Sequence, residues 1–104
     1  MAEKLSVLTL VKNRESHLAN LVRGLERSEA RPGELIVVDM GSDQPVVVHT
    51  GAFPVDVIRM ESGALPLAAA RNLAASRATG EHLVLLDVDC IPAATLLGAI
   101  DEAL

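Results

Sequence analysis

The sequence contains almost no aromatic residues and only one cysteine. Of its 104 residues one is Phe, none is Trp or Tyr, and the single cysteine is Cys90. The core therefore has to be built without large aromatic anchors, from Ala, Val and Leu. One cysteine cannot form an internal disulfide, so the sequence predicts a reducing compartment, and we expect a cytoplasmic location.

Long apolar segments and an excess of positive charge are also missing. The longest uncharged apolar stretch, near residues 65–70, is far shorter than the ~20 residues that a membrane-spanning helix needs. No targeting segment is visible. With 9 basic and 14 acidic residues the formal net charge is −5, which argues against broad contact with nucleic acid or an anionic membrane.

Half of the residues are hydrophobic, and they fall into short runs separated by helical patterns. The runs at 5–11, 34–39 and 83–86 are predicted to be buried strands, because they are continuous rather than alternating. Of two further candidates, 46–48 and 55–59, we expect the second to join the sheet. The order strand, helix, strand predicts a right-handed crossover and a mostly parallel α/β sheet with helices on both faces.

Three helices are predicted from apolar periodicity and from residues typical of helix ends. Ser16 is the expected N-cap of the first. Pro66 lies in the first turn of the second, and Gly80 beyond its end suits a left-handed cap. Pro92 is expected at the first position of the third. The predicted helices cover residues 16–28, 65–78 and 93–104.

Aspartates follow two of the predicted strands. Asp39 ends the run 34–39, and Asp87 and Asp89 follow the run 83–86. Open α/β sheets bind ligands at the carboxyl ends of their strands, so we expect these carboxylates at a ligand-binding edge. Two carboxylates are costly to hold together unless a cation shares the space, and a divalent metal is the simplest such cation. For each aspartate taken alone, turn formation or helix capping is the structural alternative.

Five short motifs occur in order along most of the chain. They are Lys12-Asn13-Arg14, Ile36-Val37-Val38-Asp39-Met40-Gly41-Ser42, Ala70-Arg71-Asn72, Gly80-Glu81-His82-Leu83 and Asp87-Val88-Asp89. Each motif is weak alone, but in this order they resemble the N-terminal half of a family 2 glycosyltransferase with the GT-A fold. The resemblance implies a truncated Rossmann-like three-layer α/β sandwich.

The resemblance also implies a nucleotide-diphosphate-sugar donor, bound with Mn²⁺ or Mg²⁺. By it, Asp39 would accept a hydrogen bond from the base, and Arg71 would offer charge to base or phosphate. Asp87 would contact ribose or donor sugar, while Asp89 would hold the metal against the diphosphate. The implied nucleotide-sugar-binding residues are Val11, Arg14, Asp39, Gly41, Arg71 and Asp87, and the implied metal ligands are Asp87 and Asp89.

The same resemblance limits what the chain is expected to do alone. The family's acceptor-binding half and its catalytic base lie beyond the Asp-x-Asp strand and have no counterpart up to Leu104. We therefore expect residues 1–104 to be a single donor-binding domain, with an unknown acceptor and no assigned base, although transfer to a hydroxyl needs one. The alternative is a non-catalytic remnant that binds nucleotide or self-associates through the apolar surface that a missing half leaves.

A signalling domain is the second alternative. The run 83–86 followed by Asp87 also resembles the phosphoacceptor strand of a response-regulator receiver. Such a domain needs an acidic pair after its first strand, whereas this chain has Lys12, Asn13 and Arg14 there. His17 and His82 show no metal-ligand spacing and are interpreted as ordinary surface residues.

Overall fold

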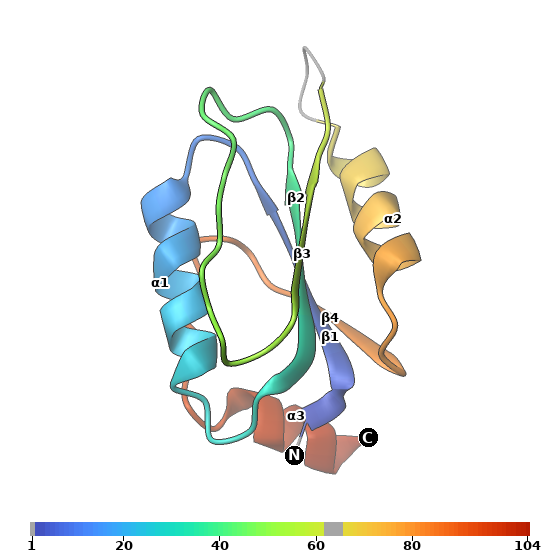
Figure 1. Ribbon diagram of the computed structural model, residues 1–104. Helices are drawn as coiled ribbons and strands as arrows, with labels where there is room; N and C mark the ends of the chain where they lie inside the picture. The colour runs from blue at the N-terminus through green and yellow to red at the C-terminus, as the bar shows by residue number, and fades with distance from the viewer. Residues whose placement is uncertain (1, 62–65) are drawn as a thin grey trace.

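The described residues form one parallel sheet with helices packed against it. A computed structural model describes residues 2–61 and 66–104. The sheet order is β3-β2-β1-β4, and every pairing is parallel (Figure 1), so the predicted parallel sheet is confirmed. The elements are β1 (Ala2–Val11), α1 (Glu15–Glu26), β2 (Pro32–Asp39), β3 (Val55–Arg59), α2 (Leu67–Arg77), β4 (His82–Leu85) and α3 (Leu96–Ala103).

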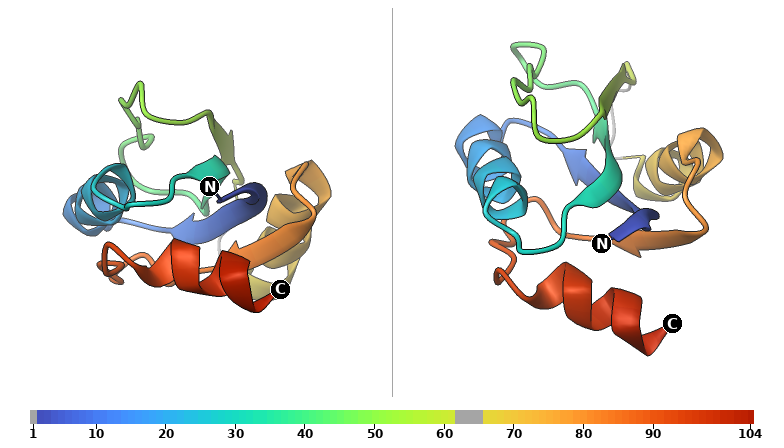
Figure 2. Two further views of the ribbon diagram at one scale, coloured as in Figure 1. Left: turned by 90° about the horizontal axis from the view of Figure 1, so that it is seen from below. Right: turned by 60° about the horizontal axis from the view of Figure 1, so that its bottom comes forward.

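Helices lie on both faces of this sheet, which confirms the predicted three-layer arrangement (Figures 1 and 2). On one face, Leu21 of α1 and Leu97 of α3 belong to the same hydrophobic core as Val7 of β1. On the other face, Ala70 of α2 packs with Leu8 of β1. Because Val7 and Leu8 are adjacent yet point into different cores, β1 is buried on both sides, which explains its continuous apolar sequence.

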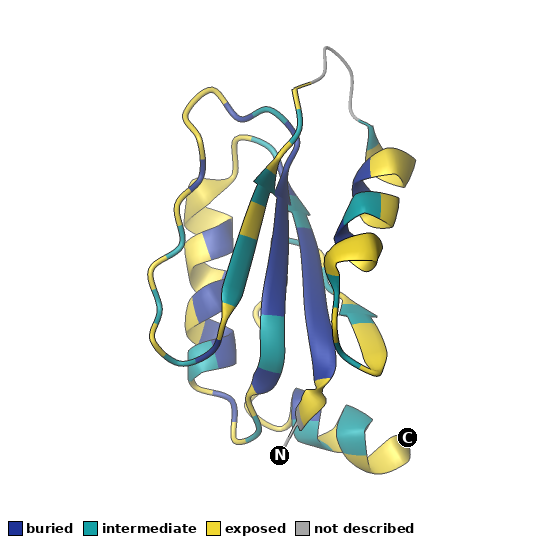
Figure 3. Ribbon diagram, turned by 45° about the vertical axis from the view of Figure 1, so that its right-hand side comes forward, coloured by how far each residue is buried: buried dark blue, intermediate teal, exposed yellow. Residues whose placement is uncertain are grey.

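The prediction of a buried strand at 83–86 was wrong. β4 forms the edge of the sheet and pairs with β1 alone, while α2 packs mainly against β1 and β2. Leu83 and Leu85 are consequently 47% and 46% exposed. Only the side chains on the opposite face, including Val84, pack against a core. Figure 3 shows the contrast between the buried central strands and the largely exposed β4.

Two predicted helix starts were also wrong. α1 begins at Glu15 with Arg14 at its N-cap, so Ser16 lies inside the first turn and caps nothing. α3 begins at Leu96 rather than at Pro92. Pro92 is buried instead against α1, where a Cβ added to Gly24 would lie 2.8 Å from the proline Cδ. Packing against a distant helix therefore decides the position of Pro92, and the helix starts later.

The second helix differs from its predicted bounds at both ends. Leu65, the predicted first residue, lies outside the described residues, and Pro66 is at the N-cap of α2. The predicted left-handed cap at Gly80 was wrong. Among the described glycines Gly41 has a positive φ, of 99°, and Gly80 does not. At Gly80 an added Cβ would lie 2.7 Å from the Lys4 carbonyl oxygen. Close approach of the chain to β1 explains this glycine.

The segment between β2 and β3 settles the choice between the two remaining strand candidates. Residues 55–59 form β3, as expected, and residues 46–48 form no strand. Val46 is instead buried in the core on the α1 face. Within residues 2–61 and 66–104, no helix has the length and apolar character needed to cross a membrane.

Candidate functional site

The carboxyl ends of β1, β2 and β4 meet at one edge of the sheet, because the strands are parallel. A groove of ≈ 420 Å³ opens at this edge, between the first turns of α1 and α2 and the loop that follows β4. Ligands of open α/β sheets bind at this edge, so the groove is the candidate site. It is lined by Leu10, Arg14, His17, Met40, Leu67, Arg71, Leu85, Leu86, Asp87, Val88 and Asp89.

Asp87 and Asp89 follow the last rung of the β4 ladder. The backbone N–H of Leu86 donates to the Leu8 carbonyl at 2.9 Å, and the Cys90 N–H then closes a turn on the Asp87 carbonyl at 2.9 Å. Both aspartates are exposed. Neither takes part in the ion pairs found between described residues. The turn therefore presents two carboxylates to the groove.

The residues present fit a hard divalent cation that also has ligands from elsewhere. The described residues contain no cluster of three or more His, Cys, Asp or Glu side chains that could hold a metal ion by itself. Mg²⁺ is usually bound through one or two carboxylates, with water and substrate phosphates completing its shell. Two exposed carboxylates such as Asp87 and Asp89 are a suitable protein share of such a site.

Two arginines and a histidine line the same groove. Arg14 and His17 come from the start of α1, and Arg71 comes from the second turn of α2. Both helices also begin at the groove, and helix N-termini carry partial positive charge that favours anions. The groove thus combines two carboxylates with two guanidinium groups, which is an arrangement able to bind an anion together with a cation.

Asp39 is enclosed by the protein and does not line the groove. It is 1% exposed. Its Oδ1 accepts the N–H groups of Gly41 at 3.2 Å and Ser42 at 2.8 Å. Its Oδ2 accepts the Val46 N–H at 3.1 Å and Arg59 Nη1 at 2.9 Å. A carboxylate has about four acceptor positions, and all four are used.

These contacts stabilise the charged form of Asp39. Burial by itself raises the pKa of the Asp39 carboxyl. The hydrogen bonds from Ser42 and Val46 and the charge of Arg59 outweigh it, so the pKa lies below its ordinary value. Asp39 is therefore an ionised residue that fixes the turn after β2 in place.

The turns after β1 and β2 are joined directly. The Asn13 N–H donates to Ser42 Oγ at 2.9 Å, and the Asp43 N–H donates to Asn13 Oδ1 at 2.7 Å. Asn13 has a φ of 54°, a left-handed conformation that asparagine tolerates better than most residues. Arg14, which lines the groove, is the next residue and donates from Nη1 to the Asn13 carbonyl at 3.0 Å.

The structure brings together four of the residues predicted for the site and separates three. Arg14, Arg71, Asp87 and Asp89 all line the groove. Val11 has a buried side chain, and its carbonyl accepts the Met40 N–H at 2.8 Å. Asp39 is enclosed as described, and Gly41 lies in the turn that encloses it. The ligand contacts of all seven residues stay predictions.

Two residues at or near the site were missed by sequence analysis. His17 lines the groove, and its spacing of three residues from Arg14 puts both on one side of α1. Arg59 pairs with Asp39. The signal for Arg59 was its register: it ends β3 opposite Asp39, which ends β2.

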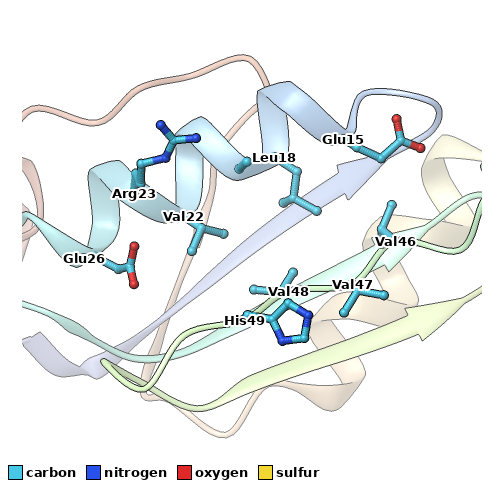
Figure 4. A pocket seen from close by; sticks show the side chains of 10 residues that line it. Glu15, Leu18, Val22, Arg23, Glu26, Val46, Val47, Val48 and His49 are labelled. Carbon is cyan, nitrogen blue, oxygen red and sulfur yellow. The ribbon is translucent and has the colours of Figure 1, made fainter.

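A second hollow, of ≈ 310 Å³, lies on the α1 face (Figure 4). One wall is α1, with Leu18 and Val22, and the other is the segment of residues 46–49. Its charged groups, Glu15 and Arg23 among them, stand beside a largely apolar lining. It contains neither Asp87 nor Asp89, so it is separate from the groove that could bind a metal and an anion.

A parallel sheet covered on both faces, with a polar groove at the carboxyl edge, defines a Rossmann-like ligand-binding domain. The model of Glycosyl transferase family 2 matches residues 6–103. The chain belongs to that family. The predicted family is therefore confirmed, and the receiver interpretation of Asp87 is replaced by it.

Relatives of known sequence and structure agree with this assignment. The chain is 35% identical over 86 residues to an uncharacterized glycosyltransferase of Haemophilus influenzae, covering 82% of this chain and 29% of that protein. The crystal structure of residues 1–349 of S. aureus TarS matches with a TM-score of 0.82 and 21% identity. It covers 98% of this chain and 32% of that one. The same part of TarS in complex with UDP matches at 0.78, with 26% identity and the same coverage.

The chain thus spans about a third of the length of the proteins that it resembles. The structural match covers 98% of the chain, so nearly all of the described fold is shared. The fold predicted from the GT-A resemblance is confirmed by this match.

Proposed function

We propose that this chain binds a nucleoside-diphosphate sugar together with Mn²⁺ or Mg²⁺, as the donor-binding part of a family 2 glycosyltransferase. The observation that carries the proposal is the presence, in one groove, of the carboxylates Asp87 and Asp89 and the guanidinium groups of Arg14 and Arg71. A diphosphate with a divalent cation presents both signs of charge and so complements this groove.

The carboxylate side of the groove is the proposed metal side. Asp89 would hold the cation, and Asp87, closer to β4, would share it or contact the ribose or donor sugar. A bound divalent cation would act as a Lewis acid that offsets the charge developing on the departing diphosphate. Arg14 and Arg71 would bind the phosphate oxygens or the base from the helix side, which orients the donor.

The nucleobase of the donor is proposed to bind near the turns after β1 and β2, at Val11, Asp39 and Gly41. The side chains of Val11 and Asp39 are buried. A base could therefore be read by exposed backbone groups of these turns, or by Asp39 after it loses one of its present donors. The TarS complex with UDP supports UDP as the first nucleotide to test.

Transfer to a hydroxyl group requires an acceptor and a general base that deprotonates it, and the proposal places neither on this chain. The activity proposed for the chain itself is therefore donor binding. A cytoplasmic location is part of the proposal, supported by the single free cysteine, Cys90.

Titration calorimetry tests the proposal with UDP and UDP-GlcNAc, each with and without Mn²⁺. We expect binding that requires the metal. Asp89→Asn removes one charge-assisted contact, which costs about 1.5–3 kcal/mol, or roughly tenfold or more in affinity. Asp101→Asn, on α3 and away from the groove, is the matched control and should bind like the wild type.

Two outcomes would contradict the proposal. Equal affinity of the wild type and Asp89→Asn would overturn the metal assignment. No heat with any nucleotide would overturn donor binding and would favour the second candidate, a self-associating remnant. That candidate is supported by the exposed Leu83 and Leu85 on the edge strand β4, since unprotected edges and apolar patches promote association.

A further inference from the structure

Arg59 ends β3, and each of the three nitrogens of its guanidinium group donates to a protein partner. Nη1 donates to Asp39 Oδ2 at 2.9 Å and Nη2 to the Ser42 carbonyl at 2.8 Å. Nε donates to Glu61 Oε1 at 2.8 Å. A planar guanidinium can satisfy partners in these fixed directions at once, which a lysine ammonium cannot do in the same way. Arg59 does not line the groove.

The partners of Arg59 lead, bond by bond, to a residue that does line the groove. Asp39 and Arg59 both bond to Ser42, through its N–H and its carbonyl. Ser42 Oγ accepts the N–H of Asn13. Arg14 follows Asn13 in the chain and bonds back to its carbonyl. The series Arg59, Asp39, Ser42, Asn13 is here called the latch.

The latch determines a backbone conformation that would be unfavourable without support. Asn13 is the non-glycine residue with a positive φ among the described residues, at 54°. Conformations of this kind cost free energy and persist where the surroundings hold them. Asn13 is held from both sides, by its N–H on Ser42 and by its side chain on the Asp43 N–H. Release of Ser42 would free Asn13 and, with it, the direction in which the chain enters α1 at Arg14.

We propose that Arg59 is a positioning residue, which acts through Asp39, Ser42 and Asn13 to fix Arg14 at the groove. The inference rests on the proposed function, because Arg14 is positioned there for a nucleotide. It assigns Asp39 a role that does not need direct contact with the base. It also explains why both acceptor oxygens of Asp39 face protein donors.

A double-mutant cycle tests this inference by the affinity for UDP with Mn²⁺. Arg59→Gln should weaken binding about fivefold in the wild-type background, because residues in one hydrogen-bond network are coupled. In the Arg14→Gln background, the same change should have almost no further effect. Arg59→Lys should restore part of the affinity. Arg77→Gln, which breaks the ion pair to Asp56 near the far end of α2, is the control and should leave the affinity unchanged.

Additive effects of Arg59→Gln and Arg14→Gln would overturn the inference, since a purely structural loss would act equally in both backgrounds. Amide hydrogen exchange gives an answer that does not depend on nucleotide. In Arg59→Gln, the N–H groups of Asn13 and Asp43 should exchange faster, while those of β1 keep their protection. Unchanged exchange at Asn13 and Asp43 would overturn the latch even if UDP binds. Absence of UDP binding in the wild type would instead overturn the proposed function. The exchange rates of Asn13 and Asp43 would still show whether Arg59 supports the latch.

Discussion

The turn after β2 and the turn after β4 begin from the same sequence pattern and become opposite kinds of site. In both places an apolar run leads directly into an aspartate. Asp39, after β2, is 1% exposed and accepts four hydrogen bonds from the protein. Asp87 and Asp89, after β4, are exposed at the groove.

The difference shows that the position of a strand in the sheet decides what its terminal aspartate does. β2 is central, with β1 and β3 on either side. The segment that follows β2 and the end of β3 therefore both lie within hydrogen-bonding distance of Asp39. β4 is at the edge and has one neighbour. A carboxylate that the protein has already satisfied holds structure, whereas an unsatisfied one is available to a ligand.

The largest expected effect is on stability and separates the two aspartates. Asp39→Ala leaves Arg59 and three backbone N–H groups without their acceptor. Asp39 is buried while Arg59 is partly exposed, so the main loss comes from the backbone donors around Asp39. Leaving one buried donor without its acceptor costs about 1–3 kcal/mol, and the loss of several such bonds should exceed about 3 kcal/mol in total. Asp87→Ala should change the free energy of unfolding by no more than about 0.5 kcal/mol, as surface substitutions do. Urea unfolding monitored by circular dichroism measures both, and similar losses for the two variants would remove the distinction.

The same contrast should appear in the strands themselves. Leu8 of β1 and Leu85 of β4 are opposite one another in the sheet, but Leu8 is 4% exposed and Leu85 46%. Leu8→Ala should lose about 3 kcal/mol, because it leaves a cavity between β1 and α2. Leu85→Ala should lose clearly less, since half of its side chain is already in water. Equal losses in chemical unfolding would mean that β4 is covered in solution, for example by a second molecule.

A smaller effect is expected from acid. Burial raises the pKa of the Glu34 carboxyl. The hydrogen bonds that Ser6 and Thr79 donate to the carboxylate lower this pKa by more than burial raises it, so it lies below the ordinary 4.5. The pKa of Asp39 is also lowered, from its ordinary value of 3.8. A carboxyl whose pKa is lower in the folded state stabilises the fold above its unfolded pKa, and this is lost as the pH falls through the folded pKa. The wild type should therefore lose stability progressively below about pH 4.5.

Unfolding free energies measured between about pH 3 and 7 test this assignment. Glu34→Gln should be less stable than the wild type at neutral pH and should show a flatter decline in acid. Asp101→Asn serves as the control, with the wild-type slope. A decline in Glu34→Gln as steep as in the wild type would show that other groups cause the acid sensitivity.

Much of the fold could be predicted from the sequence, because its determinants are local. The continuous apolar runs of β1 and β2 and the helical spacing in α1 are readable in short windows. The errors arose where distant residues decide. Pro92 packs on Gly24, and Gly80 lies close to Lys4. Pro92 therefore does not start a helix and Gly80 does not cap one, although the neighbouring sequence suggested both roles.

The groove was predictable only in part. The predicted residues that line the groove belong to ordered motifs and lie together because the carboxyl ends of parallel strands meet at one edge of the sheet. They are Arg14, Arg71, Asp87 and Asp89. His17 was missed because a single histidine near a helix start carries no motif. Arg59 was missed because its partner Asp39 is 20 residues away in sequence, and only the register of β3 against β2 brings them together.

The sequence by itself determined the parallel α/β architecture, the family and the edge of the sheet at which polar residues gather. These follow from periodicity and motif order along the chain. Only the tertiary structure decided that Asp39 is satisfied within the protein while Asp87 and Asp89 are exposed. The physical reason is that burial and hydrogen bonding of a carboxylate depend on which other segments lie beside it. For Asp39 those segments are the turn to Val46 and the end of β3.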